Sequence, residues 1–279
     1  MNNEIKVPFR IMGVVNVTPD SFYDGGKHDT TVSAVEHSLR LAEQGADILD
    51  IGGASSRPGA SPVPQEEEKR RILPVIKEVA ARFSGPISVD TTWSGVAEAA
   101  LDAGASWIND ISAGRADPEM IRLAARRKCT MVLMHSRGTP ETMQINPGYD
   151  DVVSEVREEL LDACRKFIEG GVSRDKIILD PGIGFAFAKT AEHNLALLRG
   201  LDKIAELGYP VLLGTSRKRF IGQITGKEVQ DRLCGTLATV AAGYLRGSRI
   251  FRVHDVDETR DFLKVLAVIE KGLPVEYFS

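Results

Sequence analysis

Two stretches, AEQGADILDIG at residues 42–52 and LDAGASWINDIS at residues 101–112, repeat the same junction between a helix and a strand. In each, a helical segment is followed by a glycine, where a left-handed C-cap is needed, and then by a short apolar run that ends in polar residues. Runs of this kind recur along the chain and predict eight strands, at residues 11–17, 48–52, 86–91, 107–112, 130–135, 176–181, 210–216 and 249–254. Their near-continuous apolar character indicates strands covered on both faces.

Amphipathic helical patterns separate these strands, as at residues 31–44, 66–83 and 151–169. Alternating strands and helices with right-handed crossovers fit a closed (β/α)8 barrel better than an open doubly wound sheet, and such a barrel typically needs about 250 residues. We therefore predict an α/β protein that consists of a single TIM-barrel domain over residues 1–279.

Polar residues lie at or just past the C-terminal end of every predicted strand. They are Asn16, Asp50, Asp90, Asn109, Asp110, His135, Asp180, Ser216, Arg217, Lys218, Arg252 and His254. In a (β/α)8 barrel these strand ends converge on one face, where the catalytic loops lie. The sequence therefore predicts one active site at the C-terminal ends of the strands.

The bulk composition excludes several classes of protein. A formal net charge of -4 provides no overall attraction to nucleic acid or to an anionic membrane. The three cysteines are odd in number and lack metal-ligand spacing, and the N-terminus lacks the basic start and apolar run of a signal peptide. No window approaches about 18 uninterrupted apolar residues. We expect an enzyme of the reducing cytoplasm.

Three segments suit an anion. The loop NVTPDSFYDGGKH at residues 16–28 could fold over a ligand, and Asn16 could offer Mg²⁺ a neutral oxygen. The loop DIGGASSRPGASP at residues 50–62 combines glycines, serines and Arg57, which suit phosphate, although it is neither a P-loop nor a dinucleotide fingerprint. Arg252 and His254 share one side of their strand. Each loop, taken alone, also fits an ordinary surface turn.

A second set of residues suits a polar heterocycle. Asp90, Asn109 and Asp180 could pair with the ring and amino groups of a pterin, and Lys218 could lean over them. Taken singly, each acid also fits a helix cap. His135 fits a structural role, and the absence of a Ser-His-Asp order or a Cys/His cluster argues against acyl-enzyme and zinc chemistry.

The ordered motifs NVTPDSF, DIGG, SRPG, SVDT, NDIS, MH, ILDPGIGF, SRK and RVHD resemble those of the dihydropteroate synthases, over nearly the whole chain. The resemblance implies a transferase that displaces diphosphate from 6-hydroxymethyl-7,8-dihydropterin diphosphate with the amine of p-aminobenzoate. It also implies Mg²⁺, a dissociative displacement, inhibition by sulfonamides and a homodimer. Apolar stretches at residues 233–246 and 262–268 could supply the face between subunits, although core burial explains them equally well.

The resemblance also assigns roles to individual residues. Asp90, Asp180 and Lys218 would be catalytic. The pterin would be held by Asp90, Asn109, Asp180, Lys218, Met134 and Phe185. The diphosphate would meet Asn16, Ser56, Arg57, Arg252 and His254, with Asn16 also the metal ligand. The p-aminobenzoate would be bordered by Phe22, Pro58, Ser216 and Phe185.

Two departures from the family pattern stand out. Ala54 and Ser56 replace the acidic residue and threonine of GGESTRPG, which alters the charge of that loop. The sixth loop reads GFAFAKT, as if Phe185-Ala186 were repeated as Phe187-Ala188. We hypothesise that this insertion reshapes the outer pocket and weakens sulfonamide binding more than substrate binding; a tolerated lengthening of the loop is the alternative.

Two other functions share parts of this pattern. A pterin-dependent methyltransferase could use the same barrel and the same Asp-Asn-Asp set, but it has no need of diphosphate-binding groups. A non-catalytic pterin-binding module would have no need of them either. The predicted anion set therefore favours the synthase.

Overall fold

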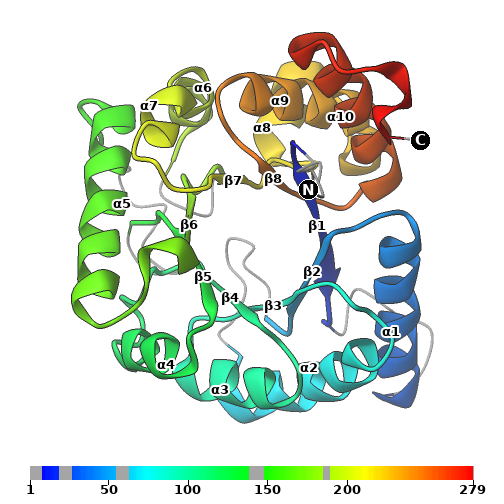
Figure 1. Cartoon of the computed structure of the whole chain (residues 1–279), viewed down its shortest axis with the longest axis vertical. Helices are drawn as coiled ribbons and strands as arrows, with labels where there is room; N and C mark the ends of the chain where they lie inside the picture. The colour runs from blue at the N-terminus through cyan, green and yellow to red at the C-terminus, as the bar shows by residue number, and fades with distance from the viewer. Residues whose placement is uncertain (1–7, 19–26, 55–62, 138–147, 185–188, 279) are drawn as a thin grey trace, which may run out of the picture.

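The computed structural model describes residues 8–18, 27–54, 63–137, 148–184 and 189–278, which form a barrel of parallel strands inside a ring of helices (Figure 1). The strands are β1 (Arg10–Asn16), β2 (Ile48–Gly52), β3 (Ile87–Asp90), β4 (Trp107–Asp110), β5 (Thr130–Met134), β6 (Ile177–Asp180), β7 (Leu212–Leu213) and β8 (Ile250–Val253). The (β/α)8 barrel predicted from the sequence is confirmed.

Hydrogen-bonded neighbours follow the order β6-β5-β4-β3-β2-β1-β8-β7. The two ends of this order meet through a parallel bridge between Leu179 and Val211, where the Leu179 N–H donates to the Pro210 carbonyl at 2.9 Å. The barrel is therefore nearly closed. β7 is shorter than the predicted 210–216, partly because Pro210 has no N–H to donate to a ladder.

The helices lie outside the barrel, between successive strands (Figure 1). They are α1 (Lys27–Glu43), α2 (Gln65–Ala80), α3 (Ser94–Asp102), α4 (Glu119–Arg127), α5 (Val152–Glu169), α6 (Ala191–Arg199), α7 (Leu201–Ala205), α8 (Arg219–Thr225), α9 (Leu233–Leu245) and α10 (Val256–Lys271), with short 3₁₀ turns η2 (Arg174–Lys176), η4 (Val229–Asp231) and η5 (Val275–Phe278). The three helices predicted at 31–44, 66–83 and 151–169 are confirmed with small shifts of their ends. No helix in the described part of the chain is long and apolar enough to cross a membrane.

Local sequence sets where two of these helices begin. Asp151 caps α5, because its carboxylate accepts the N–H groups of Val153 and Ser154. Thr190 caps α6 in a capping box with His193. These caps fix the helix starts that follow the β5 and β6 loops.

The interior face of several strands changes from apolar to polar along its length. One buried apolar cluster joins interior positions of seven strands, namely Met12, Ile48, Trp107, Val132, Ile178, Leu212 and Ile250. Alternate strand residues, such as Leu49 and Leu133, belong instead to the larger cluster shared with the helices. On four of these strands, the residue two positions after the cluster member is polar or charged: these residues are Asp50, Asn109, Asp180 and Arg252. The barrel therefore has an apolar floor and a polar mouth.

Candidate active site

Arg252 lies at the centre of the polar mouth. Its Nε donates to Asp50 Oδ2 at 2.6 Å and its Nη2 donates to Asp90 Oδ2 at 2.8 Å. One planar guanidinium thus joins β8 to β2 and β3 across the barrel mouth. Asn109 Nδ2 donates to the same Asp50 oxygen at 3.0 Å, which adds β4 to the chain of contacts.

Burial and neighbouring charges shift the pKa values of this group. Burial raises the pKa of Asp90 to about 7, against the opposing effect of Arg252, and the neighbouring carboxylates of Asp50 and Glu68 add to the rise. The carboxylates of Asp50, Asp90 and Asp180 hold the pKa of Arg252 above its usual range despite burial. The guanidinium therefore stays charged, and Asp90 accepts a proton more readily than an exposed carboxylate does.

Two buried polar atoms of this group have no hydrogen-bond partner among the described residues. Asp50 Oδ1 and Asn109 Oδ1 are buried, and neither receives a hydrogen bond from that part of the chain. Buried acceptors of this kind normally pair, since leaving one unsatisfied costs about 1–3 kcal/mol. The arrangement suits a ligand that brings hydrogen-bond donors to the barrel mouth.

Asp180 and Lys218 influence each other through their charges. Asp180 Oδ1 accepts the Gly182 N–H at 2.7 Å, and the Lys218 ammonium donates to the Ile183 carbonyl. Burial raises the pKa of Asp180, and the charge of Lys218 opposes this rise most strongly. Burial likewise lowers the pKa of Lys218 to about 8, with Asp180 opposing.

The turn after β7 directs two consecutive basic residues, Arg217 and Lys218, to different partners. Arg217 has a φ of 56°, in the left-handed region that few residues other than glycine adopt. Its Nε donates to Asp255 Oδ2 at 2.9 Å, so its charge is engaged at the start of α10. Lys218, next in the chain, donates instead to the Ile183 carbonyl, in the turn that follows Asp180.

Ser216 and His254 meet beside the pair. His254 Nδ1 lies 3.0 Å from Ser216 Oγ, and the backbone N–H of His254 donates to the same oxygen at 3.2 Å. The protein packed around the ring, and then the charge of Arg252, lower the pKa of His254 to about 4, although the residue keeps an exposed face. Because the imidazole is neutral near pH 7, it acts through its hydrogen bonds rather than as a cation.

The structure brings together the described members of the predicted site. Asp90, Asn109, Asp180, Ser216, Lys218, Arg252 and His254 lie at the barrel mouth as above. Met134 pairs in register with Asp180, and Asn16 pairs with Gly52, both at strand ends. The predicted residues Phe22, Ser56, Arg57, Pro58 and Phe185, and the Phe187-Ala188 insertion, lie outside the described residues.

Sequence reasoning missed one member of the site and part of the role of another. Asp50 was noted as a strand-end residue but received no role, yet it is fully buried and anchors both Arg252 and Asn109. Arg252 was assigned to an anion alone, whereas the structure gives it two carboxylate partners. The signal for Asp50 was its place at the end of an apolar strand, on the interior face.

Comparison with known proteins identifies the family. The profile of the family described as pterin binding enzyme matches residues 12–254. The dihydropteroate synthase of Bacillus subtilis (strain 168) is 45% identical over 263 residues, which cover 94% of this chain and 89% of that relative.

Solved structures agree with this match. The Xanthomonas albilineans dihydropteroate synthase with 4-aminobenzoic acid has a TM-score of 0.89 at 46% identity and covers 95% of this chain and 94% of that chain. The same enzyme in complex with 7,8-dihydropteroate has a TM-score of 0.86 at 44% identity, with the same coverage. The Yersinia pestis enzyme with a sulfonamide drug complex has a TM-score of 0.88 at 36% identity and covers 95% of both chains.

The barrel with its polar mouth is thus that of a pterin-binding enzyme, and the chain belongs to that family. Within the family it belongs to the dihydropteroate synthases, transferases that join 6-hydroxymethyl-7,8-dihydropterin diphosphate to p-aminobenzoate and release 7,8-dihydropteroate and diphosphate. These relatives support the synthase over the pterin-dependent methyltransferase.

Asp50 provides a test of the central ion pair. Replacing Asp50 with alanine removes one carboxylate from a guanidinium held between two, and we expect the free energy of unfolding to fall by about 3 kcal/mol. Asp102→Ala is the matched control, because Asp102 pairs with Arg127 at 2.7 Å but its side chain is 65% exposed. Denaturant unfolding should show a loss below about 1 kcal/mol for this control. Equal losses for the two variants would show that Asp50 is not an anchor.

Proposed function

We propose that the barrel mouth catalyses the condensation by a dissociative displacement. The bond between the pterin methylene carbon and the diphosphate oxygen breaks first, and the electron pair leaves with diphosphate. The amine of p-aminobenzoate then attacks the methylene, and its nitrogen releases a proton to solvent. The observation that carries this proposal is the partly buried Asp50–Arg252–Asp90 group beside Asn109, Asp180 and Lys218.

The pterin end of the site would consist of Asp90, Asn109, Asp180 and Lys218, with Met134 against the ring. Asn109 Oδ1 and the carboxylate of Asp180 offer acceptors to the amino and ring N–H groups, while Lys218 offers a donor. Asp90, when ionised, would stabilise the positive charge that grows on the pterin methylene. Because Arg252 holds Asp90 by one oxygen, the carboxylate is already oriented before the substrate binds.

Mg²⁺ would bind at the diphosphate end of the site. Asn16 ends β1 on the same alternating face as Met12, which supports its side chain as a ligand at the barrel mouth. In the described residues no three His, Cys, Asp or Glu side chains gather to hold a metal. A single neutral oxygen suits Mg²⁺, which takes the rest of its ligands from water and substrate phosphates. Bound Mg²⁺ would supply charge neutralisation of the departing diphosphate.

The remaining assignments follow the resemblance. Ser56, Arg57, Arg252 and His254 would donate to the diphosphate, and Phe22, Pro58, Ser216 and Phe185 would border p-aminobenzoate. The hydrogen bond between His254 and Ser216 supports a shared boundary of the two subsites. Sulfonamides would compete with p-aminobenzoate, in keeping with the Yersinia pestis complex.

We also propose that the enzyme works in the cytoplasm as a homodimer. Its three cysteines are free thiols, as a reducing compartment would keep them. Val265 and Ile269 of α10 and Leu245 of α9 are exposed large apolar residues on neighbouring helices, which a partner subunit could cover.

The dimer can be tested by light scattering. We expect the parent protein to have twice the chain mass and Ile269→Glu to have a lower mass, because a charge would disrupt the apolar face. A wild-type monomer would contradict the dimer.

The main experiment measures diphosphate release from the two substrates with and without Mg²⁺. We expect release to require the metal and to be lost in both Asp180→Ala and Lys218→Ala, because each removes a charge that contacts the pterin. Circular dichroism should confirm that both variants fold. Full activity in the two variants would overturn the assigned site.

The lowered pKa of Lys218 predicts a pH dependence. Because the folded pKa of Lys218 is about 8, the ammonium loses its proton as the pH rises through that value. We expect kcat/KM for the pterin diphosphate to decline above about pH 8. Lys218→Arg keeps its charge at this pH, so its decline should move toward higher pH even if its maximum is lower. Identical alkaline declines in both proteins would assign the titration to another group.

The sixth-loop insertion predicts a change in drug discrimination. We expect deletion of Phe187 and Ala188 to lower the sulfonamide inhibition constant more than it lowers the p-aminobenzoate KM, because the extra aromatic residue would crowd the drug beyond the shared ring. Both constants are measured on the deletion variant and on the parent. An unchanged ratio of the two constants would contradict this hypothesis and support the alternative, in which the longer loop is simply tolerated.

A further inference from the structure

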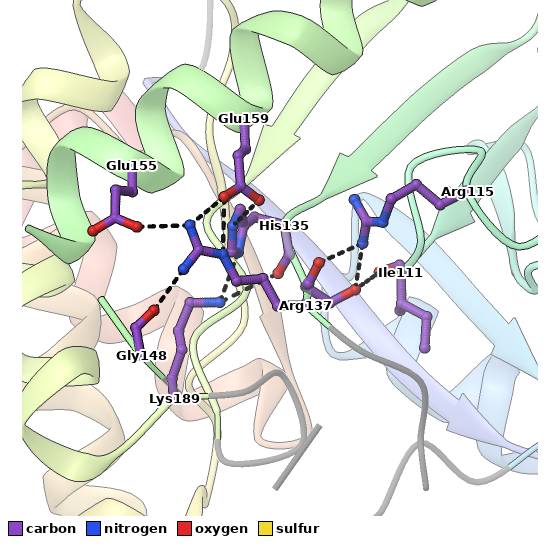
Figure 2. A network of polar contacts seen from close by, with 9 residues as sticks. Ile111, Arg115, His135, Arg137, Gly148, Glu155, Glu159 and Lys189 are labelled. Atoms are coloured by element: carbon purple, nitrogen blue, oxygen red, sulfur yellow. Dashed lines mark hydrogen bonds and ion pairs between the residues drawn. The ribbon is translucent and has the colours of Figure 1, made fainter. Parts of the chain in front are cut away.

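A buried polar network lies behind the pterin end of the site, and none of the roles above uses it. Lys189 Nζ lies 2.9 Å from His135 Nδ1, and His135 Nε2 lies 3.0 Å from Glu159 Oε2 (Figure 2). Lys189 is 2% exposed and His135 1%. Because taking an ammonium out of water is costly, such a lysine persists only where its contacts compensate for the loss.

The contacts define the state of the imidazole. Nδ1 faces an ammonium donor and Nε2 faces a carboxylate acceptor, so the ring is neutral with its proton on Nε2. Burial, followed by the charge of Lys189, lowers the pKa of His135 to about 4, in agreement with this state. His135 therefore accepts from Lys189 and donates to Glu159.

The inner half of the network contacts the turn that carries Asp180. Lys189 Nζ donates to the His135 carbonyl at 3.3 Å, and the His135 N–H donates to the Asp180 carbonyl at 2.9 Å. Gly182 has a φ of +67°, and a Cβ there would lie 1.9 Å from the His135 carbonyl oxygen and 3.2 Å from Lys189 Nζ. The backbone of the turn therefore packs directly against His135 and Lys189.

Charge links Lys189 to the same turn. Among the charges that favour the ionised form of Asp180, Lys218 is the strongest, and Arg252 and Lys189 contribute less. Asp180 in turn is the largest influence opposing the effect of burial on Lys189, whose pKa burial lowers to about 7. Asp180 thus lies within the field of two lysines, one at the site and one behind it.

We infer that Lys189 is a positioning residue for pterin binding, which holds the 180–184 turn from behind through His135. The turn presents two groups to the site: the Asp180 carboxylate and the Ile183 carbonyl that accepts from Lys218. A shift of the turn would move both together. This inference rests on the proposed binding of the pterin by Asp180 and Lys218.

The outer half of the network, around Arg137 and Glu159, contacts other parts of the chain. Arg137 donates to Glu159 Oε1 at 2.9 Å, to Glu155 Oε2 at 2.7 Å and to the Gly148 carbonyl at 2.7 Å (Figure 2). Its guanidinium also lies 4.0 Å from the centroid of the Tyr149 ring. These contacts tie α5 to the chain before it, so Glu155 provides a control within the same network but away from the turn.

The test compares Lys189→Met with Glu155→Gln in the full-length protein. Methionine keeps an unbranched apolar stem without the ammonium. Calorimetry with 6-hydroxymethyl-7,8-dihydropterin should show about a tenfold loss of affinity, the effect of losing about one charge-assisted hydrogen bond. The KM for p-aminobenzoate should stay within about twofold of the parent value. Glu155→Gln should bind the pterin as the parent does.

A second pair of variants decides the matter if Lys189→Met does not fold. His135→Asn keeps an acceptor near the position of Nδ1, whereas His135→Leu removes it. We expect the asparagine variant to retain most of the pterin affinity and the leucine variant to lose about tenfold. Equal affinities in these two variants would overturn the inference.

Two further outcomes separate this inference from the proposed function. Parent-like pterin affinity in Lys189→Met, or a lower Tm with equal losses for pterin and p-aminobenzoate, would overturn the positioning role. Asp180→Asn is titrated alongside. If it binds pterin as the parent does, the proposed pterin site itself is wrong; if it loses binding while Lys189→Met does not, only the positioning role fails.

Discussion

The polar mouth of the barrel depends on one shared guanidinium. Arg252 contacts Asp50 at 2.6 Å and Asp90 at 2.8 Å, so a single cation on β8 balances two desolvated carboxylates on β2 and β3. Without that cation, two acids would face each other at the end of an apolar interior, and one of them would take up a proton. With it, Asp90 is held in a fixed orientation and Asn109 is fixed through Asp50. The group therefore both stabilises the barrel mouth and prepares it for a ligand.

The apolar floor explains why this group lies where it does. Strand alternation places Ile48 below Asp50, Trp107 below Asn109 and Ile250 below Arg252, so that water is excluded from beneath the charges. Low access of water strengthens each electrostatic contact and raises the penalty for any group left unpaired. The same burial that raises the pKa of Asp90 and lowers that of Lys218 makes both groups responsive to a charged or polar substrate.

Sequence reasoning predicted the barrel and most of the described site, because both depend on local patterns. Eight apolar runs define the strands, and a polar residue at the end of a strand must reach the common face. It could not predict the sharing of Arg252 between Asp50 and Asp90, because that contact depends on how β8, β1 and β2 are staggered once the barrel closes. It assigned Lys218 rather than Arg217 to the site, and the structure adds a physical reason, because Arg217 has a positive φ and contacts Asp255.

Two lysines on opposite sides of Asp180 affect both its charge and its position. In the proposed binding mode Asp180 accepts from the pterin as a carboxylate, although burial raises its pKa. Lys218 opposes this rise from the ligand side, yet its ammonium donates to the Ile183 carbonyl, which moves with the same turn. Lys189 opposes it from the protein side and contacts His135, on which Gly182 packs. In the proposed site, the charge of this carboxylate thus depends on neighbouring cations, and its position depends on the turn against which His135 and Lys189 pack.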